Sequence, residues 1–182
     1  MNVPLLALDN GEQSDRDAFR RDVLAGLSQA PRAIPAKYLY DARGSALFDA
    51  ICDQPEYYPT RTEAAILRQH APEIARLAGP GTALVEYGSG SSVKTRLLLD
   101  AMPGLQAYVP IDISRQHLET TARRLREDYP GPRIAPVTGD YMALDALPDT
   151  VGDARRVGFF PGSTIGNLVP EEAVLFLKRA RR

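Results

Sequence analysis

The chain has 182 residues and a formal net charge of −1 at pH 7; 44% of its residues are apolar and 25% are charged. This length allows one domain with a substantial core, and the near-neutral charge gives no electrostatic case for binding nucleic acid. No apolar run approaches the roughly 20 residues of a membrane span, and the N-terminus lacks the pattern of a signal peptide, so we expect a cytoplasmic protein without membrane contact.

The first part of the chain is predicted to be helical. A helix is expected to begin at Ser14, and a short second helix covers 45–52. Thr60 and Glu63 have the spacing of a capping box, which predicts that a helix begins after them. Because proline fits the first position of a helix, Pro72 is predicted to restart one.

From residue 83 onward, short apolar strands alternate with helices. The predicted strands are 83–85, 107–111, 133–137 and 156–160. This alternation is typical of a doubly wound parallel sheet, whose ligands bind at the carboxyl ends of the strands. The residues at those ends are Glu86, Gly88, Asp112, Asp140, Tyr141 and Gly162.

The turn after the first of these strands has the sequence Gly-Ser-Gly-Ser-Ser-Val-Lys-Thr over 88–95. A phosphate-binding P-loop and a dinucleotide fingerprint both require glycine where Val93 stands. An ordinary tight turn before a helix is a further interpretation. Glu86 ends the strand, and Asp112 ends the next strand at about the 20-residue distance of a ribose-binding acid. This pair of acids favours S-adenosylmethionine (SAM) as the ligand.

Cysteine and histidine give no sign of a disulfide or a metal centre. Cys52 is the single cysteine and lies beside an apolar run, which favours a buried core thiol over a nucleophile. His70 and His117 have no set of ligands beside them, so we expect no metal site.

Four motifs resemble the histidine-specific N-methyltransferases of ergothioneine biosynthesis. They lie at 37–49 (Lys-Tyr-Leu-Tyr-Asp-x-Arg-Gly-Ser-x-Leu-Phe-Asp), 55–61 (Pro-Glu-Tyr-Tyr-Pro-Thr-Arg), 88–95 and 162–167 (Gly-Ser-Thr-Ile-Gly-Asn). The resemblance covers roughly residue 35 to the end. It implies a Rossmann-like class I SAM-dependent methyltransferase that methylates the α-amino nitrogen of L-histidine three times to give hercynine.

The resemblance also implies a role for individual residues. With Glu86 at the strand end, the expected SAM-binding residues are Tyr40, Gly88, Lys94, Asp112, Asp140 and Tyr141. Asp112 would accept the ribose hydroxyls, and Asp140 would lie near the adenine amine. Tyr57 would face the substrate imidazole, Asn167 would bind its carboxylate, and the Gly162 backbone would lie near its α-amine. No residue is expected to act as a dedicated catalytic base. Adjacent tyrosines at 57 and 58 are equally compatible with plain packing.

The number of strands and the end of the chain suggest an incomplete enzyme. Only four strand candidates are present, fewer than a complete sheet of this type has. We expect an N-terminal portion of a longer enzyme, with a missing C-terminal segment and an open hydrophobic edge at 156–160. Residues 1–60 would be a helical segment contributing to a substrate domain, and 61–182 an incomplete SAM-binding domain. A SAM-binding fragment without full activity, or a relative acting on another small amine, are the alternatives.

Overall fold

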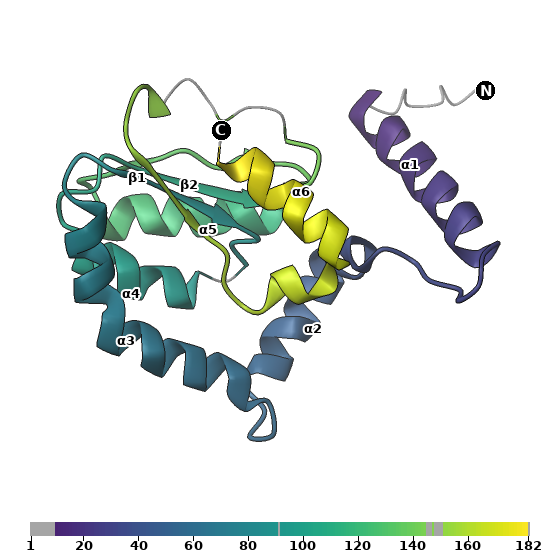
Figure 1. The fold of residues 1–182 in the computed structure, drawn as a ribbon, viewed down its shortest axis with the longest axis horizontal. Helices are drawn as coiled ribbons and strands as arrows, with labels where there is room; N and C mark the ends of the chain where they lie inside the picture. Colours follow the sequence, from purple (N-terminus) through teal and green to yellow (C-terminus); the bar gives the residue numbers. More distant parts are fainter. Residues whose placement is uncertain (1–9, 91, 145–146, 148–150, 182) are drawn as a thin grey trace, which may run out of the picture. The chain divides into compact units, whose positions relative to one another are not determined.

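The computed structural model describes residues 10–90, 92–144, 147 and 151–181, and the chain divides into two compact units, 1–39 and 40–182 (Figure 1). This division lies earlier than the domain boundary predicted after residue 60. The assignment of 1–60 to a substrate domain stays a prediction.

The first unit contains helix α1 (Asn10–Leu27) and the short 3-10 helix η1 (Ala36–Leu39). Helix α1 begins about one turn before Ser14, where the sequence placed its start. The ring of Tyr38 meets the ring of Phe19 edge-on, with 4.8 Å between centroids. The Tyr38 hydroxyl also donates to a carboxylate oxygen of Asp22 at 2.6 Å. These contacts fold the segment after α1 back onto the helix.

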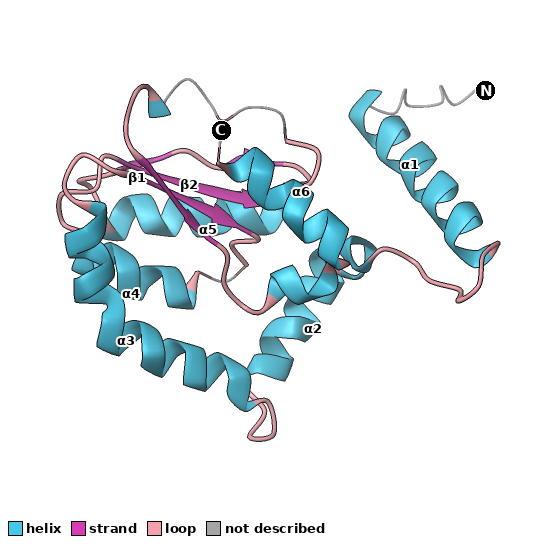
Figure 2. Ribbon diagram, viewed as in Figure 1, coloured by secondary structure: helices cyan, strands magenta, loops and turns pink. Residues whose placement is uncertain are grey.

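The second unit contains a parallel sheet with helices on both of its faces (Figure 2). Its strands are β1 (Ala83–Tyr87), β2 (Ala107–Asp112), β3 (Arg133–Ile134), β4 (Val137–Thr138) and β5 (Arg156–Phe159). Its helices are α2 (Ala42–Cys52), α3 (Tyr58–Ala78), α4 (Val93–Ala101), α5 (Arg115–Asp128), the 3-10 helix η3 (Thr164–Asn167) and α6 (Pro170–Ala180). The strand order is β3-β2-β1-β5, with β4 also paired to β2, so the predicted parallel fold is confirmed.

The core lies on both faces of β1 and β2, because successive side chains of a strand point to opposite sides. Leu84 belongs to the core cluster that packs against helices α3, α4 and α5. Its neighbour Val85 belongs to the cluster on the other face, where Phe176 of α6 packs. All five residues of β1 are buried, which is the pattern of a strand covered on both faces. The two central strands therefore form a rigid platform whose carboxyl ends share one edge.

The third predicted strand, 133–137, is two short strands in the structure. Both β3 and β4 pair with β2, and Ala135 donates its N–H to the Tyr108 carbonyl at 2.9 Å between them. The next residue, Pro136, has no N–H to donate and therefore interrupts the ladder.

Three further predicted helix starts are wrong, because tertiary packing and capping contacts outweigh the local signals. Helix α2 begins at Ala42, and Asp41 caps it by accepting from the Gly44 N–H at 2.7 Å. Helix α3 begins at Tyr58, so Thr60 lies inside it and donates to the Cys52 sulfur at 3.3 Å instead of capping. Helix α3 also continues through Pro72, since buried residues on both sides of the proline hold it against the sheet.

Strand β5 is the last strand in the described order and pairs with β1 alone among the described strands. Strand β5 is thus an edge strand of the described sheet, and its Val157 and Phe159 are half-buried against the core; the open hydrophobic edge expected at 156–160 stays a prediction. A tendency to associate through this edge stays a prediction. Within the described residues, no helix is both long enough and apolar enough to span a membrane.

Candidate functional site

The glycine turn (residues 88–90) follows β1 and is held against the end of β2. The N–H groups of Gly88 and Ser89 donate to the Ile111 carbonyl at 2.9 and 3.2 Å. Asp112, the last residue of β2, accepts the Gly90 N–H at 3.1 Å and the Ser114 N–H at 2.9 Å. The structure thus brings together the turn and the acid that the sequence placed at separate strand ends. Their contact with SAM stays a prediction.

The backbone of the glycine turn requires glycine and leaves room beside it. Gly88 and Gly90 have φ values of 77° and 47°, in the left-handed region that side chains disfavour. A Cβ atom added at Gly90 would meet no described atom within 4 Å, so the turn has an open side. The hydroxyl of Ser89, the middle residue of this turn, is buried and has no hydrogen-bond partner among the described residues. An open turn with an unpaired hydroxyl and a half-exposed carboxylate at Asp112 fits a ligand rich in hydroxyl and amine groups, as SAM is.

Glu86 lies in β1, just before the glycine turn, and its side chain is buried in the core. Its carboxylate accepts from the Thr95 hydroxyl at 2.6 Å and, at a short distance, from the Tyr108 hydroxyl. Burial raises the pKa of Glu86 from 4.5 to about 7, although both hydroxyls and the Lys94 ammonium favour its charged form. The described partners of Glu86 therefore belong to the protein, and its predicted contact with SAM stays a prediction.

Tyr141 follows β4 and is one of the residues predicted to bind SAM. Its pKa is raised, first by burial and then by electrostatic interaction with Asp140, Tyr40 and Asp112. Because such electrostatic effects weaken with distance, these three groups lie close enough to Tyr141 to affect its pKa. The four residues predicted from separate parts of the sequence therefore lie near one another.

The Tyr141 ring packs in an aromatic cluster formed by the end of β1, the residue after β5 and helix α6. It meets the rings of Tyr87, Phe160 and Phe176 edge-on, with centroids 6.4, 5.3 and 5.7 Å away. Neighbouring Asp140 accepts the Met142 N–H at 2.8 Å, which orders the turn after β4. Edge-on packing stabilises the position of the ring.

The tyrosine pair at 57 and 58 divides into one packed and one exposed residue. Tyr58 is 66% exposed, whereas Tyr57 packs edge-on against Phe48, which in turn meets Tyr40. The pKa of Tyr57 is raised by burial first and then by Cys52, Tyr40 and Glu63. Plain packing thus accounts for part of the Tyr57 environment. Its expected contact with the substrate imidazole stays a prediction.

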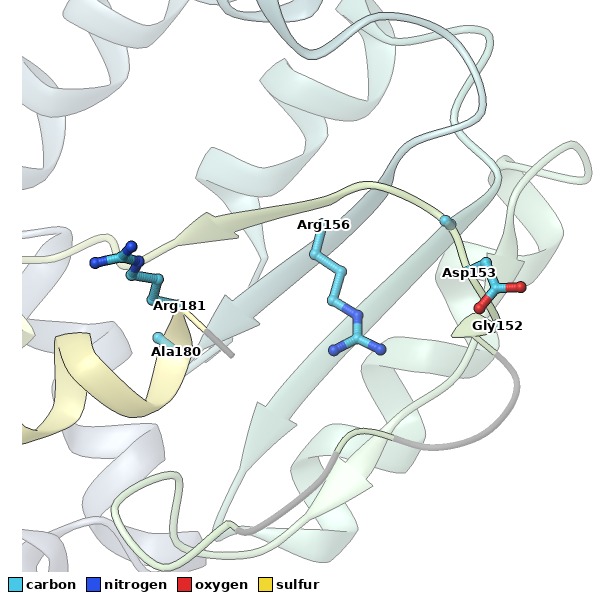
Figure 3. Close-up of a pocket in the computed structure, with 6 residues that line it drawn as sticks. Gly152, Asp153, Arg156, Ala180 and Arg181 are labelled. Atoms are coloured by element: carbon cyan, nitrogen blue, oxygen red, sulfur yellow. The ribbon is translucent and has the colours of Figure 1, made fainter.

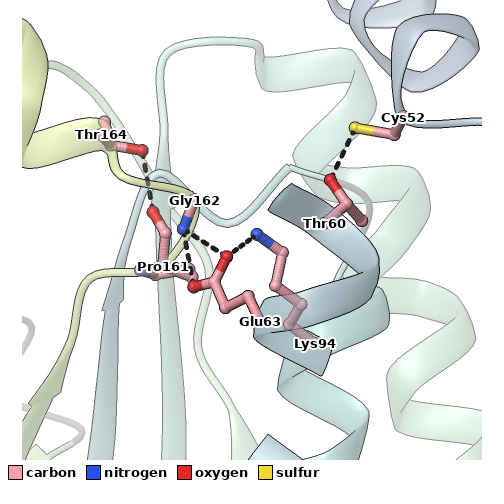
Figure 4. Close-up of polar contacts among 7 residues, drawn as sticks. All are labelled: Cys52, Thr60, Glu63, Lys94, Pro161, Gly162 and Thr164. Carbon is pink, nitrogen blue, oxygen red and sulfur yellow. Dashed lines mark hydrogen bonds and ion pairs between the residues drawn. The ribbon is translucent and has the colours of Figure 1, made fainter. Parts of the chain in front are cut away.

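A carboxylate that sequence analysis missed connects two predicted site residues. Glu63 of α3 accepts from the Lys94 ammonium at 2.6 Å and from the Gly162 N–H at 2.9 and 3.1 Å (Figure 4). These partners are 31 and 99 residues away in the sequence, so no local pattern indicates them. The spacing from Thr60 indicated a cap instead, and that prediction is wrong.

The β5 turn (residues 161–164) faces the glycine turn. Gly162 and Ser163 have φ values of 76° and 58°, and the Thr164 hydroxyl closes the turn by donating to the Pro161 carbonyl at 2.9 Å. A Cβ atom added at Gly88 would lie 3.9 Å from a methyl carbon of Thr164. The predicted substrate turn and the predicted SAM turn are therefore neighbours.

Asn167 lies in η3, just beyond the β5 turn, with an exposed side chain. The expected contact of this amide with a substrate carboxylate stays a prediction.

A separate cavity of about 460 Å³ lies at the other end of the sheet. It is lined by Gly152, Asp153, Ala154, Arg156, Ala180 and Arg181 (Figure 3). Arg156 is the first residue of β5, so this cavity opens at the amino end of that strand. None of the predicted site residues lines it, and ligands of doubly wound sheets bind at the opposite, carboxyl ends. The cavity therefore does not belong to the candidate site.

Comparisons with known proteins agree with this arrangement. The family described as histidine-specific, SAM-dependent methyltransferases matches residues 19–182. The histidine N-alpha-methyltransferase of Mycolicibacterium smegmatis is 48% identical over 168 residues, which are 90% of this chain and 51% of that protein. Its counterpart from Mycobacterium tuberculosis is 45% identical over 170 residues, 92% of this chain and 52% of that protein. The chain thus spans about half the length of these relatives.

A solved structure shows the same fold at low sequence identity. The magnesium protoporphyrin IX methyltransferase of Synechocystis PCC 6803, determined with bound SAM, superposes with a TM-score of 0.54 at 15% identity, covering 79% of this chain and 67% of that one. This likeness supports the Rossmann-like fold of class I SAM-dependent methyltransferases. Because the family match covers almost the whole chain, the protein belongs to the histidine-specific, SAM-dependent methyltransferase family.

Proposed function

We propose that this chain binds SAM and takes part in methylating the α-amino nitrogen of L-histidine to trimethylhistidine, or hercynine, a step of ergothioneine biosynthesis. One observation supports this most strongly: Gly88 of the glycine turn faces Thr164 of the β5 turn, and Glu63 connects Lys94 with Gly162 across the same edge. Family membership and the names of the mycobacterial relatives support the choice of histidine.

The chain's own residues would hold SAM through charge and shape. Asp112 offers carboxylate oxygens to the ribose hydroxyls, while Tyr141 offers an aromatic surface to adenine and Asp140 an acceptor to its amine. The Lys94 ammonium has further N–H donors beside the one bound to Glu63, and these suit the carboxylate of SAM. SAM, when bound, supplies the methyl group on a positively charged sulfur.

The substrate residues would orient histidine rather than take its proton. The α-ammonium must lose a proton before methyl transfer, and its pKa of roughly 8 requires only a modest depression in a desolvated site. The raised pKa values of Tyr57 and Tyr141 keep both phenols neutral at pH 7, so neither is a suitable base. Positioning and exclusion of water would therefore supply most of the rate enhancement.

Calorimetry with the purified chain tests the proposal. We expect SAM and S-adenosylhomocysteine to bind, and L-histidine to bind when S-adenosylhomocysteine is present. Incubation with SAM and histidine, followed by mass spectrometry, would detect methylated products. Tryptophan and histamine serve as matched acceptors, since the first changes the side chain and the second removes the carboxylate.

The possible outcomes separate the candidate functions. Failure of SAM to bind would refute the proposal as a whole. SAM binding without any interaction with histidine favours the SAM-binding fragment without full activity. Faster methylation of another amine than of histidine would assign the chain to a relative with a different acceptor. Fractionation of cells would test the cytoplasmic location expected from the sequence.

A further inference from the structure

Glu63 connects three elements that are distant in the sequence. It lies in the first turns of α3, Lys94 lies in the first turn of α4, and Gly162 lies in the β5 turn (Figure 4). Its carboxylate bonds both partners at once, with distances between 2.6 and 3.1 Å. A contact of this kind joins helices α3 and α4 to the β5 turn of the candidate site.

The Glu63 contacts are sheltered enough to hold their geometry. The side chains of Lys94 and Glu63 are 18% and 30% exposed, so water screens the ion pair only in part. Hydrogen bonds that involve a charged partner are shorter and stronger than neutral ones. A lysine side chain loses much rotational freedom when it is held in place, and Glu63 holds the ammonium before any ligand arrives.

The β5 turn needs such support because its backbone has positive φ angles, which are unfavourable for a residue with a side chain such as Ser163. Gly162 and Ser163 are consecutive residues with positive φ, and Ser163 is not a glycine. Backbone of this kind persists where surrounding contacts fix it. The Thr164 hydroxyl holds the Pro161 carbonyl from within the turn, while Glu63 holds the Gly162 N–H from outside it. Glu63 therefore fixes the orientation of the peptide group between Pro161 and Gly162.

We propose that Glu63 is a positioning residue that aligns the Lys94 ammonium for SAM and the Gly162 turn for the amino-acid substrate. This inference rests on the proposed function, because it assigns the two turns to the two ligands. Glu63 touches neither ligand in this account and acts through its two protein partners. It consequently makes the geometry of one ligand site depend on the other.

Two substitutions separate the two contacts. Glu63→Gln keeps an acceptor for the Gly162 N–H but removes the charge that pairs with Lys94. We expect it to weaken SAM binding about three- to tenfold and to change histidine binding less than twofold. Glu63→Ala removes both contacts and should weaken each ligand about tenfold or more. Glu73→Gln is the control, since Glu73 lies on the same helix and pairs with His70 at an exposed position.

Hydrogen exchange gives a readout that requires no ligand. In Glu63→Ala, the peptide containing Gly162 should exchange faster than in the unmodified chain, because its N–H has lost its acceptor. Glu63→Gln and Glu73→Gln should leave that exchange close to the original rate. Thermal unfolding of all variants, measured in parallel, would reveal any general loss of structure.

A double substitution tests whether Glu63 acts through Lys94. If it does, Glu63→Gln should change SAM affinity less than twofold when Lys94→Met is already present. An undiminished effect in that background, or unchanged affinities in both Glu63 variants, would overturn the positioning role. Absence of SAM binding by the unmodified chain would instead overturn the proposed function, and the positioning role with it.

Discussion

Glu86 and Glu63 are two carboxylates at the same edge of the sheet, in opposite environments. Glu86 is 1% exposed and has two hydroxyl partners, Thr95 and Tyr108, inside the core. The Glu63 side chain is 30% exposed and has a positively charged partner, Lys94. Burial makes the charged form of Glu86 costly, whereas the Glu63 carboxylate is partly exposed to solvent and forms an ion pair with Lys94. Glu86 is therefore suited to holding the fold, and Glu63 to holding the geometry of the site.

The largest expected effect tests the structural half of this comparison. Glu86→Ala leaves the buried hydroxyls of Thr95 and Tyr108 without their shared acceptor and opens a small cavity. We expect it to lower the free energy of unfolding by about 3–5 kcal/mol at pH 5, where Glu86 is neutral in the folded chain. Urea unfolding measures this change. A loss below about 1 kcal/mol, the size of an ordinary surface substitution, would show that the cluster does not stabilise the fold.

The second largest effect is expected in the pH dependence of stability, through the titration of Glu86. The pKa of Glu86 is raised from 4.5 to about 7 on folding. Between these values the folded chain keeps a proton that the unfolded chain releases, so the free energy of unfolding falls as pH rises from 4.5 to about 7. The contribution of Glu86 should change by roughly 3 kcal/mol across this window and stay constant below it.

Glu86→Gln is the matched variant for the pH experiment. The glutamine side chain does not titrate, so the difference in the free energy of unfolding between the unmodified chain and this variant should follow the titration of Glu86 alone. A difference that stays constant from pH 4.5 to pH 7 would contradict the raised pKa.

Part of the candidate site is predictable from the sequence alone. Glu86, the glycine turn and Asp112 follow from local patterns: an apolar strand, a Gly-x-Gly turn, and an acid at the end of the next strand. Parallel strands place such ends at one edge, so their proximity required no knowledge of side-chain packing. The fold class was predictable for the same reason.

The features of Glu63 and of helix α3 that the sequence did not predict depend on contacts between residues that are far apart in the sequence. Glu63 has the spacing of a cap, but its partners come from α4 and from the turn after β5. Helix α3 continues through Pro72 because its buried side packs against the sheet layer, which local propensity does not include. The break at Pro136 is different, because a proline lacks the N–H that a strand ladder needs and so indicates the interruption from the sequence alone.

A smaller effect is expected at Asp112, the carboxylate that we propose binds the SAM ribose. Asp112→Ala should weaken SAM binding by roughly 1–3 kcal/mol, because it removes acceptors for charge-assisted hydrogen bonds. Calorimetry measures this loss, and the same variant should lower the free energy of unfolding by about 0.5–2 kcal/mol, because the Gly90 and Ser114 N–H groups lose their acceptor. Unchanged SAM affinity would remove Asp112 from the cofactor site.

The smallest effect is expected at a carboxylate that is more exposed than either glutamate. Asp128 pairs with Arg96 at 2.7 Å, with 51% of the Asp128 side chain and 38% of the Arg96 side chain exposed. The pair raises the pKa of Arg96, yet water and salt screen most of the attraction. Asp128→Asn should therefore change the free energy of unfolding by about 0.5 kcal/mol or less, and the change should shrink further in 1 M salt. A loss as large as that of Glu86→Ala would mean that burial does not set the rank of these carboxylates, and the contrast between Glu86 and Glu63 would lose its physical basis.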